Sequence, residues 1–316
     1  MTTFVTGGLG FIGSNFVISH LQKYPTEEIV VIDNNSYAAN GKNLDGYWDD
    51  WRVRHVVCDI ADLASLSSLY SILKPKITYH FAAESHVDNS IAGDDTQFVR
   101  SNIIGTHNIL KCIRNHGGKL LHVSTDEVYG SLPLDGYEKF TEETAYNPRN
   151  PYSATKAASD HLVRSYVNTH KIDAVVTNCS NNYGPRQHSE KFIPTVIRHI
   201  KENKAIPVYG SGVNIRDWLY VEDHCEALLS VGESYSPGDR YNIGGGVELT
   251  NNQMVTTILD IMGKPVHDGW FNYVNDRPGH DLRYAMNSLK MRTRYGWMPR
   301  HNLTMGLEKT LRWYNA

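Results

Sequence analysis

The chain has 316 residues, of which 41% are hydrophobic and 21% are charged, and its formal net charge is -3. This length suffices for one large α/β domain or two smaller ones with a sizeable core, and the composition is that of an ordinary soluble globular protein. The small negative charge and the absence of a basic run exclude a nucleic-acid scaffold, which needs a basic face.

The cysteines and the first residues favour a cytoplasmic protein. The cysteines are widely spaced, with no Cys-x-x-Cys pair, so we expect them to be reduced and mostly buried: Cys58, Cys112, Cys179 and Cys225. The first residues lack the basic and apolar pattern of a secretory leader, so we do not expect secretion, and no apolar run reaches membrane-spanning length. It also lacks a His-Glu-x-x-His pattern, and we expect no metal.

A glycine-rich turn between a strand and a helix opens the chain. Phe4–Thr6 is a short buried-strand candidate, and the glycines Gly7, Gly8, Gly10 and Gly13 lead into an amphipathic helix that runs to about Lys23. They fit both Gly-x-Gly-x-x-Gly and Gly-x-x-Gly-x-x-Gly. Such glycines let the backbone approach a pyrophosphate, and the helix N-terminus supplies amide donors. The segment therefore predicts a dinucleotide site.

An acidic residue ends the second predicted strand, Ile29–Ile32. Asp33 would accept hydrogen bonds from the adenosine ribose hydroxyls and repel a 2′-phosphate, which favours NAD over NADP. The alternative is that Asp33 only caps a turn.

The alternation of strands and helices continues along the chain. We predict a third strand over Val53–Cys58, a helix over Leu63–Leu73, a fourth strand over Ile77–Phe81 and a long helical stretch from about Gln97 to His116. The small residues that follow the fourth strand, from Ala82 onward, would let a cofactor lie against the backbone. They fit a simple tight turn equally well.

The fifth predicted strand delivers reactive groups. Its apolar residues run into Ser124-Thr125-Asp126-Glu127, and Tyr152 and Lys156 follow on a helix over Tyr152–His170. At a spacing of four residues both side chains point the same way, so we expect the ammonium to lower the pKa of the phenol from about 10 and make it a base. Taken singly, the Tyr/Lys pair could be a chance spacing and the acidic pair a solvated turn.

A sixth strand over Ala174–Asn178 completes the pattern of an α/β protein with a doubly wound parallel Rossmann sheet. Beyond it the elements become shorter, with clustered Arg, His and aromatic residues. We expect an NAD-binding domain over 1–180 and a smaller, mainly substrate-binding region over 181–316. Segments at about 213–225 and 240–246 are expected to return to the first domain.

Together these motifs resemble the extended short-chain dehydrogenase/reductases that act on nucleotide sugars, and among them the dehydratases. The resemblance covers nearly the whole chain. Its most specific segments are Ala82–Asp88, Ser124–Gly130, Ser180–Pro185, Ile215–His224 and Asp276–Tyr284. It implies an enzyme of deoxysugar synthesis that takes dTDP-glucose to a 4-keto-6-deoxy sugar, with tightly held NAD and no net redox change.

The resemblance also implies a role for each reactive group. Tyr152 removes the C4 hydroxyl proton as hydride leaves for NAD, Lys156 lowers the pKa of that tyrosine and holds the nicotinamide ribose, and Thr125 hydrogen-bonds the C4 oxygen. Glu127 then takes the C5 proton, Asp126 protonates the departing C6 hydroxyl, and hydride returns to C6. Related epimerases have small or hydroxyl residues in place of the carboxyl pair.

Binding residues are carried over from the same resemblance. Those for NAD are Gly7, Gly10, Phe11, Ile12, Gly13, Asp33, Asp59, Ile60, Ala82, Ala83, Ser85, Asn102, Tyr152, Lys156 and Ser180. Those for the nucleotide sugar are Ser85, His86, Thr125, Asn181, Lys191, Phe192, Pro207, Tyr209, Arg216, Asn251, Arg277 and His280.

A homodimer is also implied. By similarity to extended reductases, the helices from about Gln97 and after Tyr152 would form an intersubunit bundle. The first of them contains the apolar residues Ile103, Ile104, Ile109 and Leu110.

Three alternatives stay open. The substrate could be UDP-glucose, the reaction could be a 4-epimerisation, or the chain could be a non-catalytic NAD-binding regulator that has kept the fold. The sequence also departs from the family pattern at Arg186–Phe192, where Tyr-His-Phe-Pro-Glu-Lys-Leu is usual, and at Ala39, where Gly is usual. These departures affect the expected fit of base and sugar but remove no catalytic group.

Overall fold

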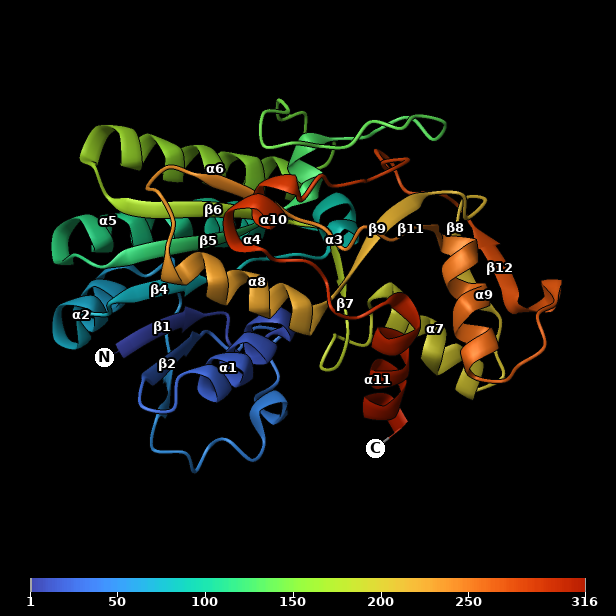
Figure 1. The fold of residues 1–316 in the computed structure, drawn as a ribbon, viewed down its shortest axis with the longest axis horizontal. Coiled ribbons are helices and arrows are strands. Elements are labelled where there is room, and N and C mark those ends of the chain that lie inside the picture. Colours follow the sequence, from blue (N-terminus) through green and yellow to red (C-terminus); the bar gives the residue numbers. More distant parts are fainter. Residues whose placement is uncertain (1, 316) are drawn as a thin grey trace.

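The structure, a computed structural model, describes residues 2–315. A seven-stranded parallel sheet in the order β10-β6-β5-β4-β1-β2-β3 carries helices on both faces, which confirms the doubly wound Rossmann fold (Figure 1). In chain order its strands are β1 Thr2–Thr6, β2 Glu28–Asp33, β3 Val53–Val57, β4 Ile77–His80, β5 Lys119–Thr125, β6 Asp173–Cys179 and β10 Arg240–Ile243.

Two smaller sheets lie beyond it. A three-stranded sheet has the order β11-β9-β7, and a parallel pair joins β8 to β12. Their strands are β7 Asn181–Tyr183, β8 Ile206–Tyr209, β9 Ile215–Tyr220, β11 Glu248–Thr250 and β12 Phe271–Val274.

The helices alternate with the strands in the first part of the chain and cluster in the second. The α-helices are α1 Phe11–Lys23, α2 Leu63–Leu73, α3 Val87–Ala92, α4 Thr96–Phe98, α5 Thr106–His116, α6 Pro151–His170, α7 Phe192–Lys201, α8 Val221–Glu233, α9 Asn251–Ile261, α10 Leu289–Tyr295 and α11 Leu303–Asn315. Shorter helical turns are η1 Gly41–Leu44, the π-helix η2 Val99–Gly105, η3 Asp126–Tyr129 and η4 Asp268–Trp270.

The large sheet is buried on both faces, which explains why its strands are apolar runs and not alternating patterns. Successive side chains still point to opposite faces. Phe4 packs with α2, α5 and α6 on one side, and its neighbour Val5 packs with α1 and α8 on the other. Leu120 and Leu121 repeat this division in β5.

The predicted elements recur with small changes at their ends. The helices that were expected to end at Lys23 and to span Leu63–Leu73 have those bounds. The long stretch expected from Gln97 is helical, but it is interrupted by the π-helix η2. The buried Asn102 lies in that segment and bonds outside the helix, a detail that apolar spacing cannot reveal.

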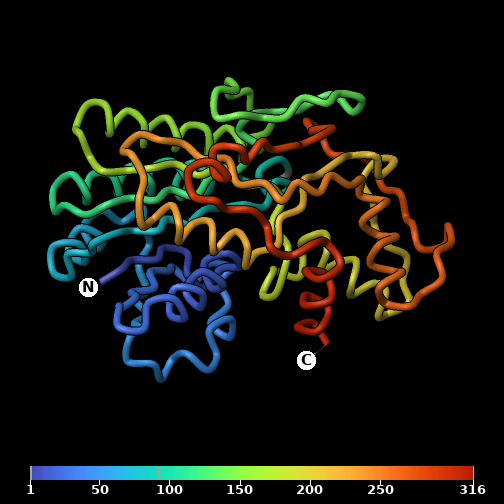
Figure 2. The backbone as a smooth tube through the Cα atoms, viewed as in Figure 1, coloured from blue at the N-terminus to red at the C-terminus, as the bar shows by residue number. Residues whose placement is uncertain are grey.

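Successive segments in the second half of the chain belong to different sheets (Figure 2). β9 belongs to the three-stranded sheet, α8 packs against α1, and β10 adds to the large sheet beside β6. A separate core joins α7, α9 and α11 to β9 through residues such as Trp218 and Met254.

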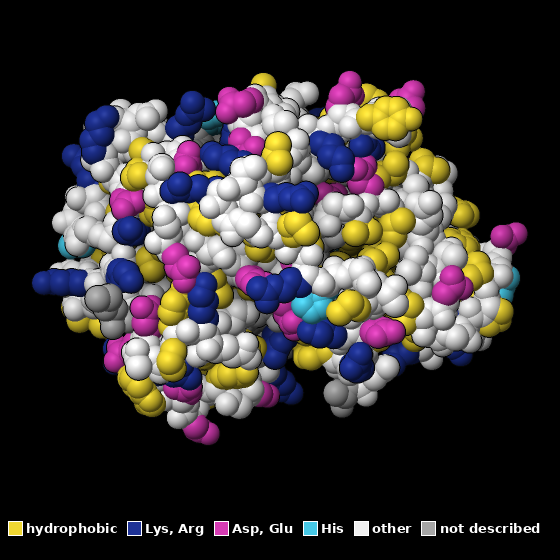
Figure 3. All heavy atoms as spheres, viewed as in Figure 1, with side chains coloured by type: hydrophobic (Ala, Val, Ile, Leu, Met, Phe, Trp, Pro, Cys, Tyr) yellow, Lys and Arg dark blue, Asp and Glu magenta, His cyan; other side chains and the backbone are white. Residues whose placement is uncertain are grey.

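The surface and the cysteines agree with the composition. On the face shown in Figure 3, acidic and basic side chains are interspersed. The four cysteines are free and buried, as predicted. None of the helices within residues 2–315 is long and apolar enough to cross a membrane.

One part of the dimer expectation is wrong. Ile109 and Leu110 are fully buried inside the subunit, in the core between the large sheet and its helices. They cannot contribute to an interface, because α5 turns that side toward its own sheet. Ile104, by contrast, is 45% exposed.

The contact between α1 and the turn after β1 yields a stability prediction. A Cβ atom on Gly13 would lie 2.2 Å from the carbonyl oxygen of Gly7, which is backbone and cannot move aside. We expect Gly13→Ala to lower the free energy of unfolding by about 1–3 kcal/mol through overpacking, measured by urea denaturation. Gly41→Ala is the control, because nothing lies within 4 Å of its added Cβ. Equal stability of the two variants would contradict this packing.

Candidate active site

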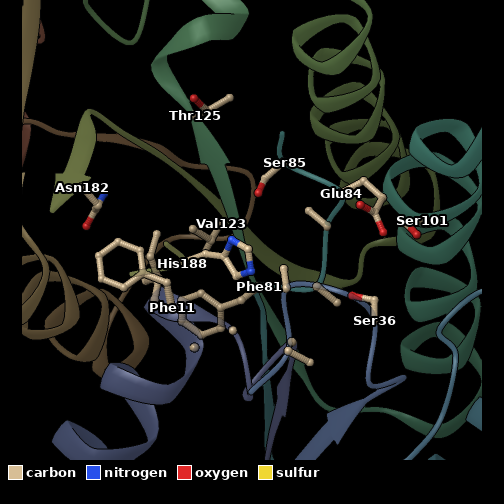
Figure 4. A pocket seen from close by; sticks show the side chains of 18 of the residues that line it. Phe11, Ser36, Phe81, Glu84, Ser85, Ser101, Val123, Thr125, Asn182 and His188 are labelled. Carbon is tan, nitrogen blue, oxygen red and sulfur yellow. The ribbon is translucent and has the colours of Figure 1, made fainter. Parts of the chain in front are cut away.

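A cavity runs along the carboxyl ends of β1, β2, β4, β5 and β6, the edge at which open α/β sheets bind ligands. Side chains from distant segments point into it, including Phe11 from the start of α1, Thr125 from the end of β5 and His188 from the loop before α7 (Figure 4). Thirteen of the predicted NAD-binding residues line this cavity: Gly7, Gly10, Phe11, Ile12, Gly13, Asp33, Ile60, Ala82, Ala83, Ser85, Tyr152, Lys156 and Ser180.

The glycine turn is fitted to a dinucleotide. Gly7 has a φ of +70°, and a Cβ there would lie 2.6 Å from the backbone nitrogen of Ala82. The two backbone segments therefore meet without side chains between them, so a pyrophosphate can approach the amides at the start of α1. The residues of this cradle fit NAD.

Asp33 ties the end of β2 to this turn. Its carboxylate accepts hydrogen bonds from the backbone N–H groups of Leu9, at 3.1 Å, and Asn35, at 3.0 Å. Burial raises the pKa of Asp33, and these two bonds act against that rise. The side chain lines the cavity, so the sequence interpretation of a ribose-binding acid is compatible with its place.

Two predicted NAD-binding residues lie outside the lining. Asp59 pairs with Arg100 at 2.8 Å and accepts a bond from the N–H of Ala61. Asn102 bonds both backbone groups of Glu84, and its amide also donates to Thr155 at 2.9 Å. Asn102 therefore holds the loop after β4 against α6.

Tyr152, Lys156 and Thr125 line the same cavity. Asn150 caps α6 in a capping box with Ser153, which fixes the first turn that carries the tyrosine. Lys156 Nζ donates to the carbonyl oxygen of Val123 at 2.9 Å.

The expected lowering of the Tyr152 pKa is wrong for this structure. Burial raises the pKa of Tyr152 well above its ordinary value, and the negative charge of Glu127 raises it further. The Thr125 hydroxyl acts in the opposite direction through a hydrogen bond. Burial also lowers the pKa of Lys156. Desolvation outweighs the effect predicted from helical spacing because both groups lie inside the protein.

The acidic pair sits where β5 ends and the chain turns into η3, so adjacent residues can serve one site. Thr125 caps this turn by accepting a bond from the N–H of Glu127. Asp126 is 2% exposed, and within residues 2–315 its Oδ2 has no hydrogen-bond partner. Burial raises the pKa of Asp126 well above its ordinary value, and the charges of Glu127 and Asp217 add to this rise.

Glu127 has a different environment. Its Oε2 accepts a hydrogen bond from Asn150 Nδ2 at 3.4 Å. Burial raises the pKa of Glu127, while Arg277, Arg216 and the Asn150 bond lower it. The two environments thus separate the pKa values of the neighbouring carboxyls, and Asp126 holds its proton more strongly than Glu127 does.

The predicted nucleotide-binding side chains form a cluster on the Glu127 side. Arg216 Nη2 approaches His280 Nε2 at 2.8 Å, and His280 Nδ1 lies 2.6 Å from Asp276. The Arg277 guanidinium lies 5.6 Å from the centroid of the Tyr209 ring. Burial lowers the pKa of His280 to about 4, and the two arginines add to this effect. The histidine is therefore neutral and orients Arg216.

Some of the other predicted substrate residues line the cavity, and some do not. Ser85, Asn181 and Lys191 line the cavity, and Lys191 Nζ donates to the Ser85 carbonyl at 3.1 Å. His86 lies 3.7 Å from Glu190. Three residues stand apart from the lining: Phe192, which stacks on Trp218, Pro207 in β8, and Asn251 at the start of α9.

Sequence reasoning missed several lining residues. Tyr37, Gln187, His188 and Glu190 all face the cavity, and the Tyr37 and His188 rings meet edge to face at 5.8 Å. The sequence did contain an indication of them, because Gln187, His188 and Glu190 lie in the segment Arg186–Phe192 that departs from the family pattern. The sequence could not show that the loop after β2, which carries Tyr37, packs against this segment.

The fold, the Tyr/Lys pair and the adjoining carboxyls define the class, an NAD-dependent short-chain dehydrogenase/reductase of nucleotide sugars. The chain matches the family described as GDP-mannose 4,6 dehydratase over residues 4–310. It is 44% identical to the dTDP-glucose 4,6-dehydratase of Mycolicibacterium smegmatis, covering 100% of this chain and 94% of that one. For dTDP-glucose 4,6-dehydratase 1 of Escherichia coli K12 the identity is 43%, with 99% and 92% covered. The chain belongs to the dTDP-glucose 4,6-dehydratase family.

Solved structures agree. The dTDP-glucose 4,6-dehydratase of Streptomyces venezuelae, with NAD and TDP bound, superimposes with a TM-score of 0.95 at 41% identity, covering 100% of this chain and 97% of that one. The UDP-glucose 4-epimerase of Thermus thermophilus, also with NAD, has a TM-score of 0.89 at 26% identity, with 100% and 99% covered. NAD is the cofactor, and the higher identity favours dehydration over epimerisation.

The position of Asp33 predicts cofactor selectivity. We expect NADP to bind on the order of 100-fold more weakly than NAD to stripped protein, because a 2′-phosphate beside a carboxylate costs several kcal/mol. Asp33→Asn should reduce that ratio, measured by calorimetry. Asp62→Asn, at the exposed N-cap of α2, is the control and should leave it unchanged. Equal affinity of the unsubstituted protein for both dinucleotides would refute the assignment.

Proposed function

We propose that this protein converts dTDP-glucose to dTDP-4-keto-6-deoxyglucose and water. The observation that carries the proposal is the buried carboxyl pair at the end of β5, beside Tyr152 and Lys156 and with the two carboxyls differing in acidity. Neither a 4-epimerase nor an NAD-binding regulator has a use for a protonated acid next to a base. The family membership supports the same reaction.

The first half of the reaction is an oxidation at C4. Bound NAD supplies the hydride acceptor for C4 and afterwards the donor for C6. Tyr152 takes the proton of the C4 hydroxyl, and Thr125, which lines the same cavity, orients the C4 oxygen. Lys156 lines the same cavity, and its positive charge would oppose the rise that burial causes in the Tyr152 pKa without outweighing it.

The second half is an elimination between C5 and C6. Oxidation at C4 acidifies the C5 proton, and Glu127 removes it. Asp126 then gives its proton to the departing C6 hydroxyl, which suits a carboxyl whose pKa is raised by burial and by neighbouring carboxylates. This separation of acid and base by environment is a general way to use two carboxyl groups in one site.

The nucleotide is assigned to the arginine cluster, which consists of Arg216, Arg277, His280 and Tyr209. Guanidinium groups bind phosphate oxygens as bidentate donors, so Arg216 and Arg277 suit the diphosphate. Tyr209 offers its ring to the base, and its hydroxyl is held by Asp88 at 3.1 Å. The TDP-bound relative supports a thymidine nucleotide over a uridine one.

The proposal predicts where catalysis stops when the carboxyl pair is changed. In Glu127→Gln and Asp126→Asn, oxidation at C4 persists but elimination slows by about 10²–10⁴-fold, because acid–base capacity is removed. Reduced cofactor should therefore accumulate after dTDP-glucose is added, visible by its absorbance, while product forms slowly. Product formation at the normal rate in both variants would refute these roles.

Three further measurements accompany this experiment. Tyr152→Phe should abolish the absorbance change itself, since it removes the base for oxidation. In heavy water the unsubstituted protein should place one solvent deuterium at C5 of the product. In a separate measurement, UDP-glucose offered in place of dTDP-glucose should give little product. Absence of deuterium at C5 would contradict proton removal by Glu127.

We also propose that the protein is a cytoplasmic homodimer. The four free cysteines suit a reducing compartment. On the π-helix η2, Val99 and Ile104 are 42% and 45% exposed, and a second subunit would cover them.

The dimer proposal has its own test. The protein should sediment as a dimer at micromolar concentration, and Ile104→Glu should shift it toward monomer by placing a charge in the apolar contact. Ile72→Glu is the matched control, because Ile72 is 75% exposed on α2, a helix outside the proposed interface. A monomer with full activity would overturn the proposal.

A further inference from the structure

A carboxylate that does not line the cavity is buried directly behind it. Asp160 lies on α6, one turn after Lys156, and is 4% exposed. Its Oδ2 accepts hydrogen bonds from Tyr146 at 2.7 Å, Ser124 at 2.8 Å and Asn178 at 3.3 Å. Its Oδ1 lies 3.1 Å from Nε2 of His122. With this many donors a carboxyl group is ionised even when it is buried.

These donors tie α6 to the catalytic end of the sheet. Ser124 belongs to β5, Asn178 belongs to β6, and Tyr146 comes from the loop before α6. Asn178 Nδ2 also donates to the carbonyl oxygen of Thr125 at 3.0 Å. The carboxylate therefore sits in a network that reaches the backbone of the residue assigned to the C4 oxygen.

Lys156 needs such a partner. Its side chain is also 4% exposed, and Nζ donates to the carbonyl of Val123, between the two β5 residues that contact Asp160. A backbone carbonyl carries no net charge, and a buried ammonium without an opposite charge tends to lose its proton. At a spacing of four residues on one helix, Lys156 and Asp160 lie on the same face.

The other titratable groups around this pair do not supply the missing charge. Burial lowers the pKa values of His80, from β4, and His122, and it raises the pKa of Cys179, from β6, to about 12. All three are therefore neutral near pH 7. Tyr129 and Tyr146 have pKa values that burial raises, and Arg240 from β10, which lies over their rings, is positive and cannot be the counter-charge of a lysine.

We propose that Asp160 is the buried counter-charge of Lys156 and so a positioning residue of the Tyr152/Lys156 base. It acts through the lysine, because it does not line the cavity itself. The proposal rests on the proposed function, which gives the charged lysine its task. In the structure, Asp160 opposes the lowering of the Lys156 pKa by burial.

The test is the pH dependence of kcat/KM for formation of the 4-keto product by the full protein with NAD bound. The enzyme is active when Lys156 is charged. Without the negative charge of Asp160, the lysine should lose its proton at lower pH. In Asp160→Asn the alkaline fall of kcat/KM should begin about one pH unit lower, which is about tenfold less activity at a given pH on that limb. Asp160→Ser is a second neutral replacement should the asparagine variant not fold.

Two controls separate charge from structure. Asp160→Glu keeps the negative charge and should restore the alkaline limb. Tyr146→Phe removes one hydrogen bond from the same oxygen but keeps the charge, so its alkaline limb should not move. If the neutral variants lower kcat/KM by one factor at every pH, Asp160 has only a structural role and the inference is overturned. If the unsubstituted protein forms no product, it is the proposed function that fails.

Discussion

The site depends on how the fold keeps ionisable groups inside the protein at the junction of β5 and α6. Asp126, Tyr152, Lys156 and Asp160 are each under 10% exposed, and burying a charge without compensation costs several kcal/mol. The structure resolves this in two ways. Asp126 is neutralised by holding its proton, while Asp160 stays charged because donors from three segments surround it.

The same junction explains why acid and base can be neighbours in sequence. In a regular strand, adjacent side chains point to opposite faces, so a carboxyl pair would be divided between the two helical layers. β5 ends at Thr125, and the chain turns at once into η3. Asn150 then links the two elements, because it caps α6 through its oxygen and donates to Glu127 through its nitrogen. The cap that begins the tyrosine helix thus also holds the catalytic carboxylate.

Much of the fold and the core of the site could be predicted from the sequence. Buried parallel strands give apolar runs, and glycines followed by a helix and an acidic strand end have few other uses, so the cradle from Gly7 to Asp33 was predictable. The π-helix at Val99–Gly105 was not, since apolar spacing does not distinguish it from an α-helix. The pKa of Tyr152 was predicted in the wrong direction, because helical spacing reports proximity and not desolvation. Asp160 was missed because its partners come from three separate segments.

The arginine cluster connects nucleotide binding to the elimination. Arg216 and Arg277 are assigned to the diphosphate, yet both lower the pKa of Glu127 in the structure. A diphosphate held by these guanidiniums would offset their charge, so the rise that burial causes in the pKa of Glu127 would meet less opposition. The same two guanidiniums would thus bind the diphosphate and act on the charge of the catalytic carboxylate. This coupling requires no movement of the chain, because His280 and Asp276 already orient Arg216.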